Sequence, residues 1–204
     1  MKSNAKLGVI ILAAGSSSRL GYPKQLVEFR GRSLLQHSLD AAGLKEFGTK
    51  LLVLGAGAPE IQKNINNRDF EVVINEKWTD GIGTSISKGI SEALKIEKDL
   101  DHILIMLSDQ PFVTKKKIHE LILMHLDTNK CATFSEYEGD VGVPAIFSRE
   151  IFPNLKKLKS DQGAKKLLHN KNFEFQTLKF EKGNFDVDTP EDVDLLRQLE
   201  KKCK

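Results

Sequence analysis

Residues 9–15 read VIILAAG, a continuous apolar run that ends in a glycine. An unbroken run of this length is typical of a β-strand buried on both faces, as in a parallel sheet that helices cover on either side. We therefore expect residues 9–13 to form such a strand, followed directly by a loop.

From residue 33 to residue 126, short apolar runs alternate with stretches whose apolar residues recur at helical spacing. Further strands are expected at residues 51–54, 72–74 and 103–107, and helices at residues 33–44, 58–65, 84–94 and 114–126. Ser33 suits the N-cap of the first of these helices, because its hydroxyl oxygen can accept a hydrogen bond from a free backbone N–H group. Strands that alternate with helices at this spacing predict βαβ units and a parallel sheet.

The remaining part of the chain is less regular. Strands are expected at residues 132–134, 143–147 and 173–180, and helices at residues 149–158, 162–168 and 190–201. The chain has no internal repeat, no low-complexity segment and no linker-like change of composition. We therefore predict a single α/β domain over residues 1–204, a length that one substantial core can support.

The composition indicates a soluble globular protein. With 31 basic and 28 acidic residues the net charge is +3, too small to indicate nucleic acid or a membrane as a partner. Cys131 and Cys203 form no CxxC or Cys/His pair, so we expect neither a disulfide framework nor a zinc site. The apolar stretch at residues 7–14 is too short to span a membrane and lacks a signal-peptide pattern, so we expect a cytoplasmic protein.

The loop after the first strand, LAAGSSSRLGYPK at residues 12–24, combines small residues with Arg19 and Lys24. In open α/β sheets, ligands bind beyond the carboxyl ends of the strands. Small residues let the backbone approach an anion, and Arg and Lys supply the charge that phosphate oxygens favour. The pattern is neither a Walker A loop nor a GxGxxG fingerprint. It predicts a cradle for a triphosphate, with a solvated surface loop as the alternative.

Acidic residues stand at two further places where they could serve a phosphate site. Asp109 follows the strand expected at residues 103–107, where an aspartate can hold Mg²⁺ against substrate phosphates or cap a turn. Asp186 and Asp188 lie two residues apart in an extended segment, so their side chains point to the same side. Two such carboxylates repel each other unless a cation lies near them, which makes them candidates for the second half of a metal site.

Four segments, in this order, resemble the MobA-like nucleotidyltransferase family, and most closely its molybdenum cofactor cytidylyltransferases. The segments are LAAGSSSRLGYPK at residues 12–24, NEKWTDGIGTSISKGI at 75–90, SDQPFV at 108–113 and DVDTPED at 186–192. The resemblance extends from about residue 7 to residue 200. It implies a three-layer α/β/α sandwich with a mostly parallel, Rossmann-like sheet of the nucleotide-diphospho-sugar transferase type.

The resemblance also implies roles for individual residues. Nucleotide contacts are implied for Leu12, Ala13, Ala14, Gly15, Ser16, Arg19, Lys24, Gly81 and Ser85, of which Arg19 and Lys24 act on the phosphates as catalytic residues. Asp109 is implied as a catalytic residue that holds Mg²⁺, or Mn²⁺ in its place, with Asp188 as the second ligand and Asp186 left open. The acceptor is implied to bind at Gly142, Pro144, Asp161, Gly163 and Lys165.

The acceptor segments depart from the family pattern. Val143 stands where the family has histidine, Ser160 where it has glycine and Lys165 where it has arginine. A lysine keeps the charge of an arginine but loses its two-pronged set of donors, so the identity of the acceptor stays open. Trp78 is expected to pack near the loop at Gly81 rather than to stack on a base.

For the reaction, the resemblance implies transfer of CMP from CTP to molybdopterin cofactor with release of pyrophosphate, and a molybdoenzyme as the partner that receives the product. Two alternatives stay open. One is a nucleotidyltransferase that uses another nucleotide and acts on a sugar phosphate or an alcohol phosphate. The other is a non-catalytic carrier that hands molybdopterin to a partner enzyme.

Overall fold

In the computed structural model, which describes residues 5–181, 183 and 185–202, strand β1 (Leu7–Ala13) is buried along its whole length inside a seven-stranded sheet. It pairs in parallel with β4 (Phe47–Leu54) on one side and with β6 (His102–Leu107) on the other. The apolar run thus forms the predicted strand, which begins two residues earlier than expected.

The strand order across the sheet is β5-β4-β1-β6-β8-β7-β9. The strands not yet given are β5 (Glu71–Ile74), β7 (Ala132–Tyr137), β8 (Asp140–Ser148) and β9 (Phe175–Lys179). Strand β8 runs antiparallel to both of its neighbours, whereas the other neighbouring pairs are parallel. The prediction of a mostly parallel sheet is confirmed.

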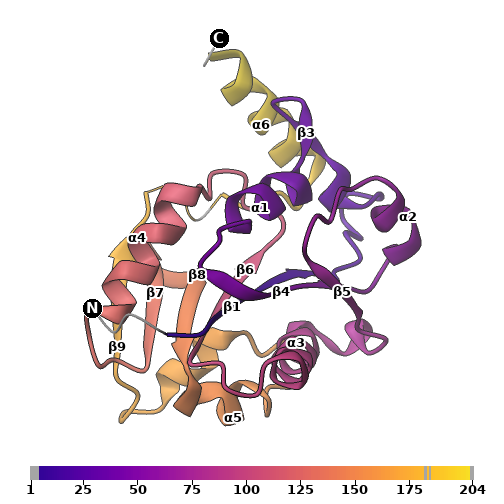
Figure 1. Ribbon diagram of the computed structural model, residues 1–204. Coiled ribbons are helices and arrows are strands. Elements are labelled where there is room, and N and C mark those ends of the chain that lie inside the picture. The colour runs from indigo at the N-terminus through magenta and orange to yellow at the C-terminus, as the bar shows by residue number, and fades with distance from the viewer. Residues whose placement is uncertain (1–4, 182, 184, 203–204) are drawn as a thin grey trace.

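Helices cover both faces of this sheet, α1 and α4 on one face and α3 and α5 on the other (Figure 1). Successive residues of a strand point to opposite faces, and in β1 Val9 packs in the core cluster with α1 and α4, whereas Ile10 packs in the cluster with α3 and α5. The three-layer sandwich is therefore confirmed. The helices are α1 (Leu34–Ala42), α2 (Ala58–Lys63), α3 (Ile82–Ile96), α4 (Lys115–Leu126), α5 (Phe152–Leu155) and α6 (Pro190–Lys202).

A third apolar cluster lies outside the sandwich and was not predicted. It joins α6 to a hairpin of two short strands, β2 (Glu28–Phe29) and β3 (Arg32–Ser33), which lie beside α6 in Figure 1. Its buried members are Leu20, Val27, Phe29, Leu34, Val187, Val193 and Leu196. The cluster fastens the segment before α6 to the loop that follows β1, and so brings the acidic residues of that segment towards the sheet.

Some predicted helices have the expected place but a different form. Ser33 caps α1 as predicted, since its hydroxyl oxygen accepts the N–H group of Gln36 at 3.2 Å. The helix expected at residues 149–158 is only a 3₁₀ turn followed by α5, because Pro153 lacks the N–H group that a continuous helix would need there. The helix expected at residues 162–168 is a 3₁₀ helix (Ala164–His169), whose backbone bonds close over three residues.

Within the part of the chain that the structure describes, no helix is both long and apolar enough to cross a membrane. Cys131 is a free thiol. Cys203 lies outside the described residues, so the expectation for it stays a prediction.

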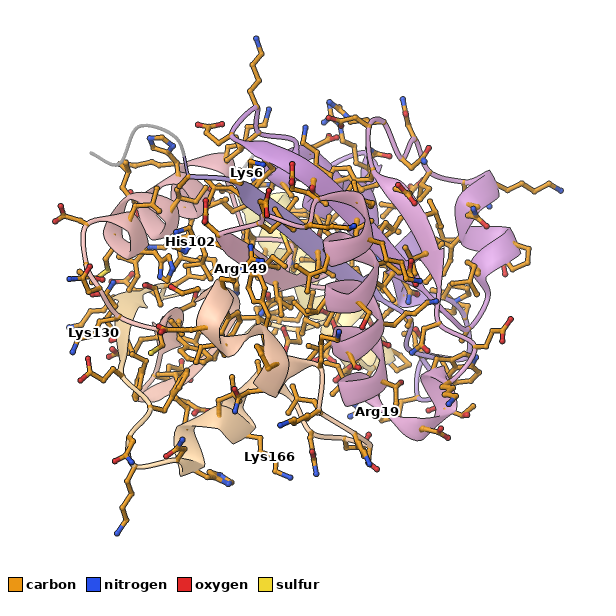
Figure 2. The ribbon with its side chains drawn as sticks, turned by 60° about the horizontal axis from the view of Figure 1, so that its bottom comes forward. Lys6, Arg19, His102, Lys130, Arg149 and Lys166 are labelled. Atoms are coloured by element: carbon orange, nitrogen blue, oxygen red, sulfur yellow. The ribbon has the colours of Figure 1, made fainter. Side chains whose placement is uncertain are left out.

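A buried histidine lies near the start of β6, at the opposite end of the strands from the loop after β1. His125 of α4 is 1% exposed, and its ring nitrogens contact Thr133 Oγ1 at 2.9 Å and His102 Nδ1 at 3.0 Å. His102 begins β6, whereas Arg19 follows the far end of the parallel strand β1, so the two lie apart (Figure 2). Burial lowers the pKa of His125 to about 3, and His102 adds to this shift.

We expect His125 to make the protein less stable in acid. In the unfolded chain His125 takes up a proton near pH 6.5, whereas in the folded chain its pKa is about 3. The contribution of the neutral His125 to stability is therefore fully present above pH 6.5 and is lost as the pH falls towards 3. At pH 5 the loss is about 2 kcal/mol of unfolding free energy. In His125→Gln, urea unfolding between pH 7 and pH 5 should show a correspondingly flatter pH dependence; equal slopes for the two proteins would contradict this role.

Candidate active site

A cleft of about 350 Å³ opens at the carboxyl ends of β1 and β6. Eight of the nine residues expected to contact the nucleotide line this cleft. They are Leu12, Ala13, Ala14, Gly15, Ser16, Lys24, Gly81 and Ser85. Asp109 and Asp161 line the same cleft. Asp188 and Arg19 lie beside the cleft: Asp188 forms an ion pair with Lys24 of the lining, and Arg19 forms an ion pair with Asp188.

The loop after β1 owes its shape to a residue that the sequence analysis did not single out, Gln25. This side chain is 1% exposed, and its amide group donates hydrogen bonds to the carbonyl oxygens of Ala13 at 2.9 Å and Gly15 at 3.2 Å. The N–H group of Lys24 donates to Ser17 Oγ at 3.0 Å. These bonds close the loop on itself and hold the backbone of Lys24 beside the end of β1.

The cations and carboxylates of the site form one connected group. Lys24 Nζ donates hydrogen bonds to Asp109 Oδ2 and, at 2.6 Å, to Asp188 Oδ1. Arg19 donates to the other oxygen of Asp188 at 2.8 Å. Asp109 is 5% exposed, whereas the side chain of Asp188 is 37% exposed. Residues from the β1 loop, the end of β6 and the segment before α6 therefore meet at one point.

The charges in this group stabilise one another. Burial alone would lower the pKa of Lys24, but attraction to Asp109 and Asp188 outweighs burial and raises it. Burial alone would raise the pKa of Asp188, but Lys24 and Arg19 favour its charged form and lower it. Lys24 and Asp188 are therefore both charged at neutral pH.

Asp186 stands in a different environment from Asp188. The residue is exposed as a whole, but its carboxyl group lies where protein atoms displace water, which raises its pKa to about 7. Repulsion from Asp109 adds to this shift. The Asp186 carboxyl group thus protonates near neutral pH, and among the described residues it forms no ion pair with Lys24 such as Asp109 and Asp188 form.

The donor set fits a divalent metal ion that also has substrate oxygens as ligands. Asp109 Oδ1 is buried and accepts no hydrogen bond from any described residue, which is an unusual state for a carboxylate oxygen. Asp109 and Asp188 already share a cationic group, Lys24 Nζ. No three His, Cys, Asp or Glu side chains are grouped to hold a metal among residues 5–181, 183 and 185–202. Magnesium commonly binds to one or two carboxylates together with substrate phosphates, so two protein ligands suffice.

The opposite wall of the cleft depends on a glycine. Gly81 has a φ of 102°, and a Cβ atom there would lie 2.3 Å from the carbonyl carbon of Ser160. The N–H group of Gly83 donates to the carbonyl oxygen of Ser160 at 2.9 Å. This close backbone contact brings Asp161 into the cleft beside Gly81.

Two further side chains of this wall are held in place by packing and hydrogen bonds. Buried Asn75 donates to Ser85 Oγ at 2.9 Å and thereby fixes it. Trp78 packs against Gly55, where a Cβ atom would lie 2.7 Å from Trp78 Cβ, and it also lines the cleft. Trp78 therefore packs on backbone beside the cleft, and the expectation that it does not stack on a base stays a prediction.

The residues expected to bind the acceptor are less closely grouped. Asp161 lines the cleft, whereas Gly142, Pro144, Gly163 and Lys165 are not among the described residues that line it. Lys165 Nζ forms an ion pair with Asp140 at 2.6 Å.

Gln110 and Tyr137, which the sequence analysis did not single out, hold the β8 part of this region. The Gln110 amide donates to the carbonyl oxygens of Val143 at 3.2 Å and Gly183 at 3.0 Å, beside the cis peptide bond before Pro144. Tyr137 packs directly on Gly142, where no Cβ atom would fit.

Comparison with known proteins gives one matching family model, the MobA-like NTP transferase domain, over residues 9–176. The nicotine blue oxidoreductase of Paenarthrobacter nicotinovorans is 28% identical, over 93% of each chain. The purine catabolism protein PucB of Bacillus subtilis strain 168 is 29% identical, over 97% of this chain and 98% of PucB.

Among solved structures, Rv0371c from Mycobacterium tuberculosis H37Rv is similar over nearly the whole chain. It is 29% identical with a TM-score of 0.81, and the match covers 97% of this chain and 98% of Rv0371c. A manganese complex of Rv0371c is 28% identical with a TM-score of 0.75, over 95% and 99% of the two chains. A related protein of this fold therefore binds manganese.

We expect Gly81→Ala to destabilise the protein by about 2 kcal/mol or more, because the new methyl group would meet the backbone of Ser160 and force the two segments of this wall apart. Gly48→Ala is the matched control, since a Cβ atom at Gly48 meets nothing within 4 Å. Denaturant unfolding measures both changes. A Gly81→Ala protein as stable as the control would show that the backbone contact between Gly81 and Ser160 is not tight in solution.

Proposed function

Because this chain belongs to the MobA-like NTP transferase family, we propose that it transfers CMP from CTP to molybdopterin cofactor and releases pyrophosphate, with Mg²⁺ as the metal ion. The observation that carries the proposal is the joined group of Lys24, Asp109 and Asp188 beside a cleft that the small residues after β1 line. A cationic group, two carboxylates and a closely approachable backbone are what nucleotidyl transfer requires.

The nucleotide enters the cleft with its triphosphate along the loop from Ala13 to Lys24. The small side chains of this loop let backbone N–H groups approach the phosphate oxygens, and Gln25 keeps the loop in one shape for them. The base and ribose lie towards Gly81 and Ser85, which line the other side of the cleft.

In the reaction, an oxygen of the acceptor phosphate attacks the α-phosphorus of CTP in line with the leaving group. The bond from the α-phosphorus to the bridging oxygen breaks, and pyrophosphate leaves with the electron pair. No general base is needed, because a phosphate acceptor is already ionised. Arg19 and Lys24 hold the phosphates in line and neutralise their charge. Mg²⁺ held by Asp109 and Asp188 supplies further charge neutralisation when bound.

The choice of CTP and molybdopterin rests on the sequence motifs. By their resemblance to the family motifs, the Leu-Ala-Ala-Gly start of the loop and the Asp-Gln-Pro form at Asp109 favour the cytidylyl branch over the guanylyl branch. A molybdoenzyme is the proposed recipient of the product. Val143 and Lys165 favour a second candidate, the same chemistry with a sugar phosphate or alcohol phosphate as acceptor, since both positions depart from the family pattern.

A pyrophosphate-release assay with CTP, GTP, UTP and ATP, each with Mg²⁺ and with molybdopterin or a sugar phosphate, tests the proposal. We expect release with CTP and molybdopterin. Preference for GTP or UTP would refute the cytidylyl assignment, and binding of the pterin without pyrophosphate release from any nucleotide would indicate a carrier. Since one relative is named an oxidoreductase, NADPH consumption is followed in parallel and should stay at background.

Asp109→Ala should lower pyrophosphate release by about a factor of 10³ or more, because it removes the buried carboxylate that faces Lys24 and the proposed metal ion. Circular dichroism should show the fold retained. Asp194→Ala is the control, since it removes an exposed carboxylate from α6 that pairs only with Arg197 among its described neighbours. Full activity of the Asp109 variant would refute the assignment of this site.

A further inference from the structure

Three of the four carboxylate oxygens of Asp109 and Asp188 are already taken by cationic side chains. Lys24 Nζ contacts one oxygen of each aspartate, and Arg19 holds the remaining oxygen of Asp188 at 2.8 Å. The fourth, Asp109 Oδ1, is buried and accepts no hydrogen bond from any residue that the structure describes. A metal ion approaching this arrangement therefore meets a positive charge at the position between the two carboxylates, and the one oxygen without a partner is buried behind it.

We propose that Lys24 keeps the metal site closed until a triphosphate draws its ammonium group away, so that the nucleotide and the metal ion bind as a coupled pair. The inference rests on the proposed function, because it assigns the same site to a nucleotide and a divalent metal ion. It adds that one side chain alternates between two sets of oxygens, those of the aspartates and those of the nucleotide.

The exchange requires only a side-chain movement. The backbone of Lys24 is anchored by the bond from its N–H group to Ser17 Oγ at 3.0 Å, and the neighbouring Gln25 is locked by its two bonds to the loop. The lysine side chain itself is a flexible four-carbon stem with a single charged end. Lys24 also lines the cleft, so phosphate oxygens there lie within reach of its ammonium group.

The nucleotide makes this movement favourable for two reasons. Its phosphate oxygens replace the carboxylates as acceptors for the ammonium group, so Lys24 does not lose its ionic partners. The same phosphates supply ligands that two aspartates alone cannot, which a small divalent ion needs to complete its shell. By linkage, a nucleotide that strengthens metal binding is itself bound more tightly when metal is present, by the same factor.

The first test measures Mn²⁺ binding to the protein without nucleotide, by electron paramagnetic resonance of the free ion. Lys24→Met and Lys24→Gln should bind Mn²⁺ at least about tenfold more tightly than the unaltered protein, because both carboxylates are released. Mn²⁺ should also raise the melting temperature of these variants more than that of the unaltered protein, since the ion replaces the missing ammonium group. Lys24→Gln keeps a neutral donor, so it answers the question if Lys24→Met folds poorly.

Arg19→Met is the matched control, because it removes the same charge from the same group without freeing the position between the aspartates. Its Mn²⁺ affinity should stay within about threefold of that of the unaltered protein. If loss of positive charge alone strengthened Mn²⁺ binding, the Arg19 and Lys24 variants would show the same increase in affinity. Lysine variants that bind Mn²⁺ no more tightly than Arg19→Met would overturn the inference.

The second test measures the affinity for α,β-methylene CTP, which cannot be cleaved at the reacting bond, with and without Mn²⁺. In the unaltered protein Mn²⁺ should strengthen nucleotide binding, and this strengthening should fall at least about tenfold in Lys24→Gln. Mn²⁺ also forms a complex with the free nucleotide, but this occurs equally in the titrations of the unaltered protein and of Lys24→Gln. It therefore cancels when the two proteins are compared. Equal coupling in both proteins counts against the inference. Failure of both proteins to bind the analogue removes the proposed function instead, and the first test still decides the role of Lys24.

Discussion

A single ammonium group shared by two carboxylates holds together three parts of the chain that are far apart in sequence. Lys24 ends the loop after β1, Asp109 follows β6, and Asp188 precedes α6. Charges in a partly buried place must be matched, since an unpaired ion there loses several kcal/mol of solvation. A cation between these aspartates therefore stabilises the fold, whether a lysine or a metal ion provides it.

The rest of the architecture serves to keep that meeting point in one place. Neighbouring parallel strands end at the same edge of the sheet, which puts the loop after β1 beside Asp109. Gln25 fixes the loop by bonds to backbone carbonyl groups, and the apolar cluster between α6 and the β2–β3 hairpin brings Asp188 from the other direction. Stability and site geometry thus depend on the same contacts.

The sandwich was predictable because a strand that is buried on both faces has an unbroken apolar sequence, such as residues 9–13. The helices that cover it have apolar residues at helical spacing. The closeness of Asp109 to the loop that carries Lys24 was predictable from the same logic, since both follow expected strands. The place of Asp188 was implied by the family resemblance alone, because the apolar cluster that brings its segment to the sheet was not predicted. The β2–β3 hairpin was missed because its strands are two residues long, too short for any period to show. The role of Gln25 could not be predicted, because its partners are main-chain carbonyl groups that every residue type possesses.

The contact between Gly81 and Ser160 has a consequence for how such a protein can diversify. The segments around Gly81 and Ser160 touch through main-chain atoms, and Gly83 joins them by a main-chain hydrogen bond, so their spacing does not depend on which side chains either segment carries. Side chains that line the cleft, such as Ser85 and Asp161, can change while these two segments keep their spacing. A cleft assembled in this way can change the side chains that it presents to a ligand while its main-chain frame stays the same.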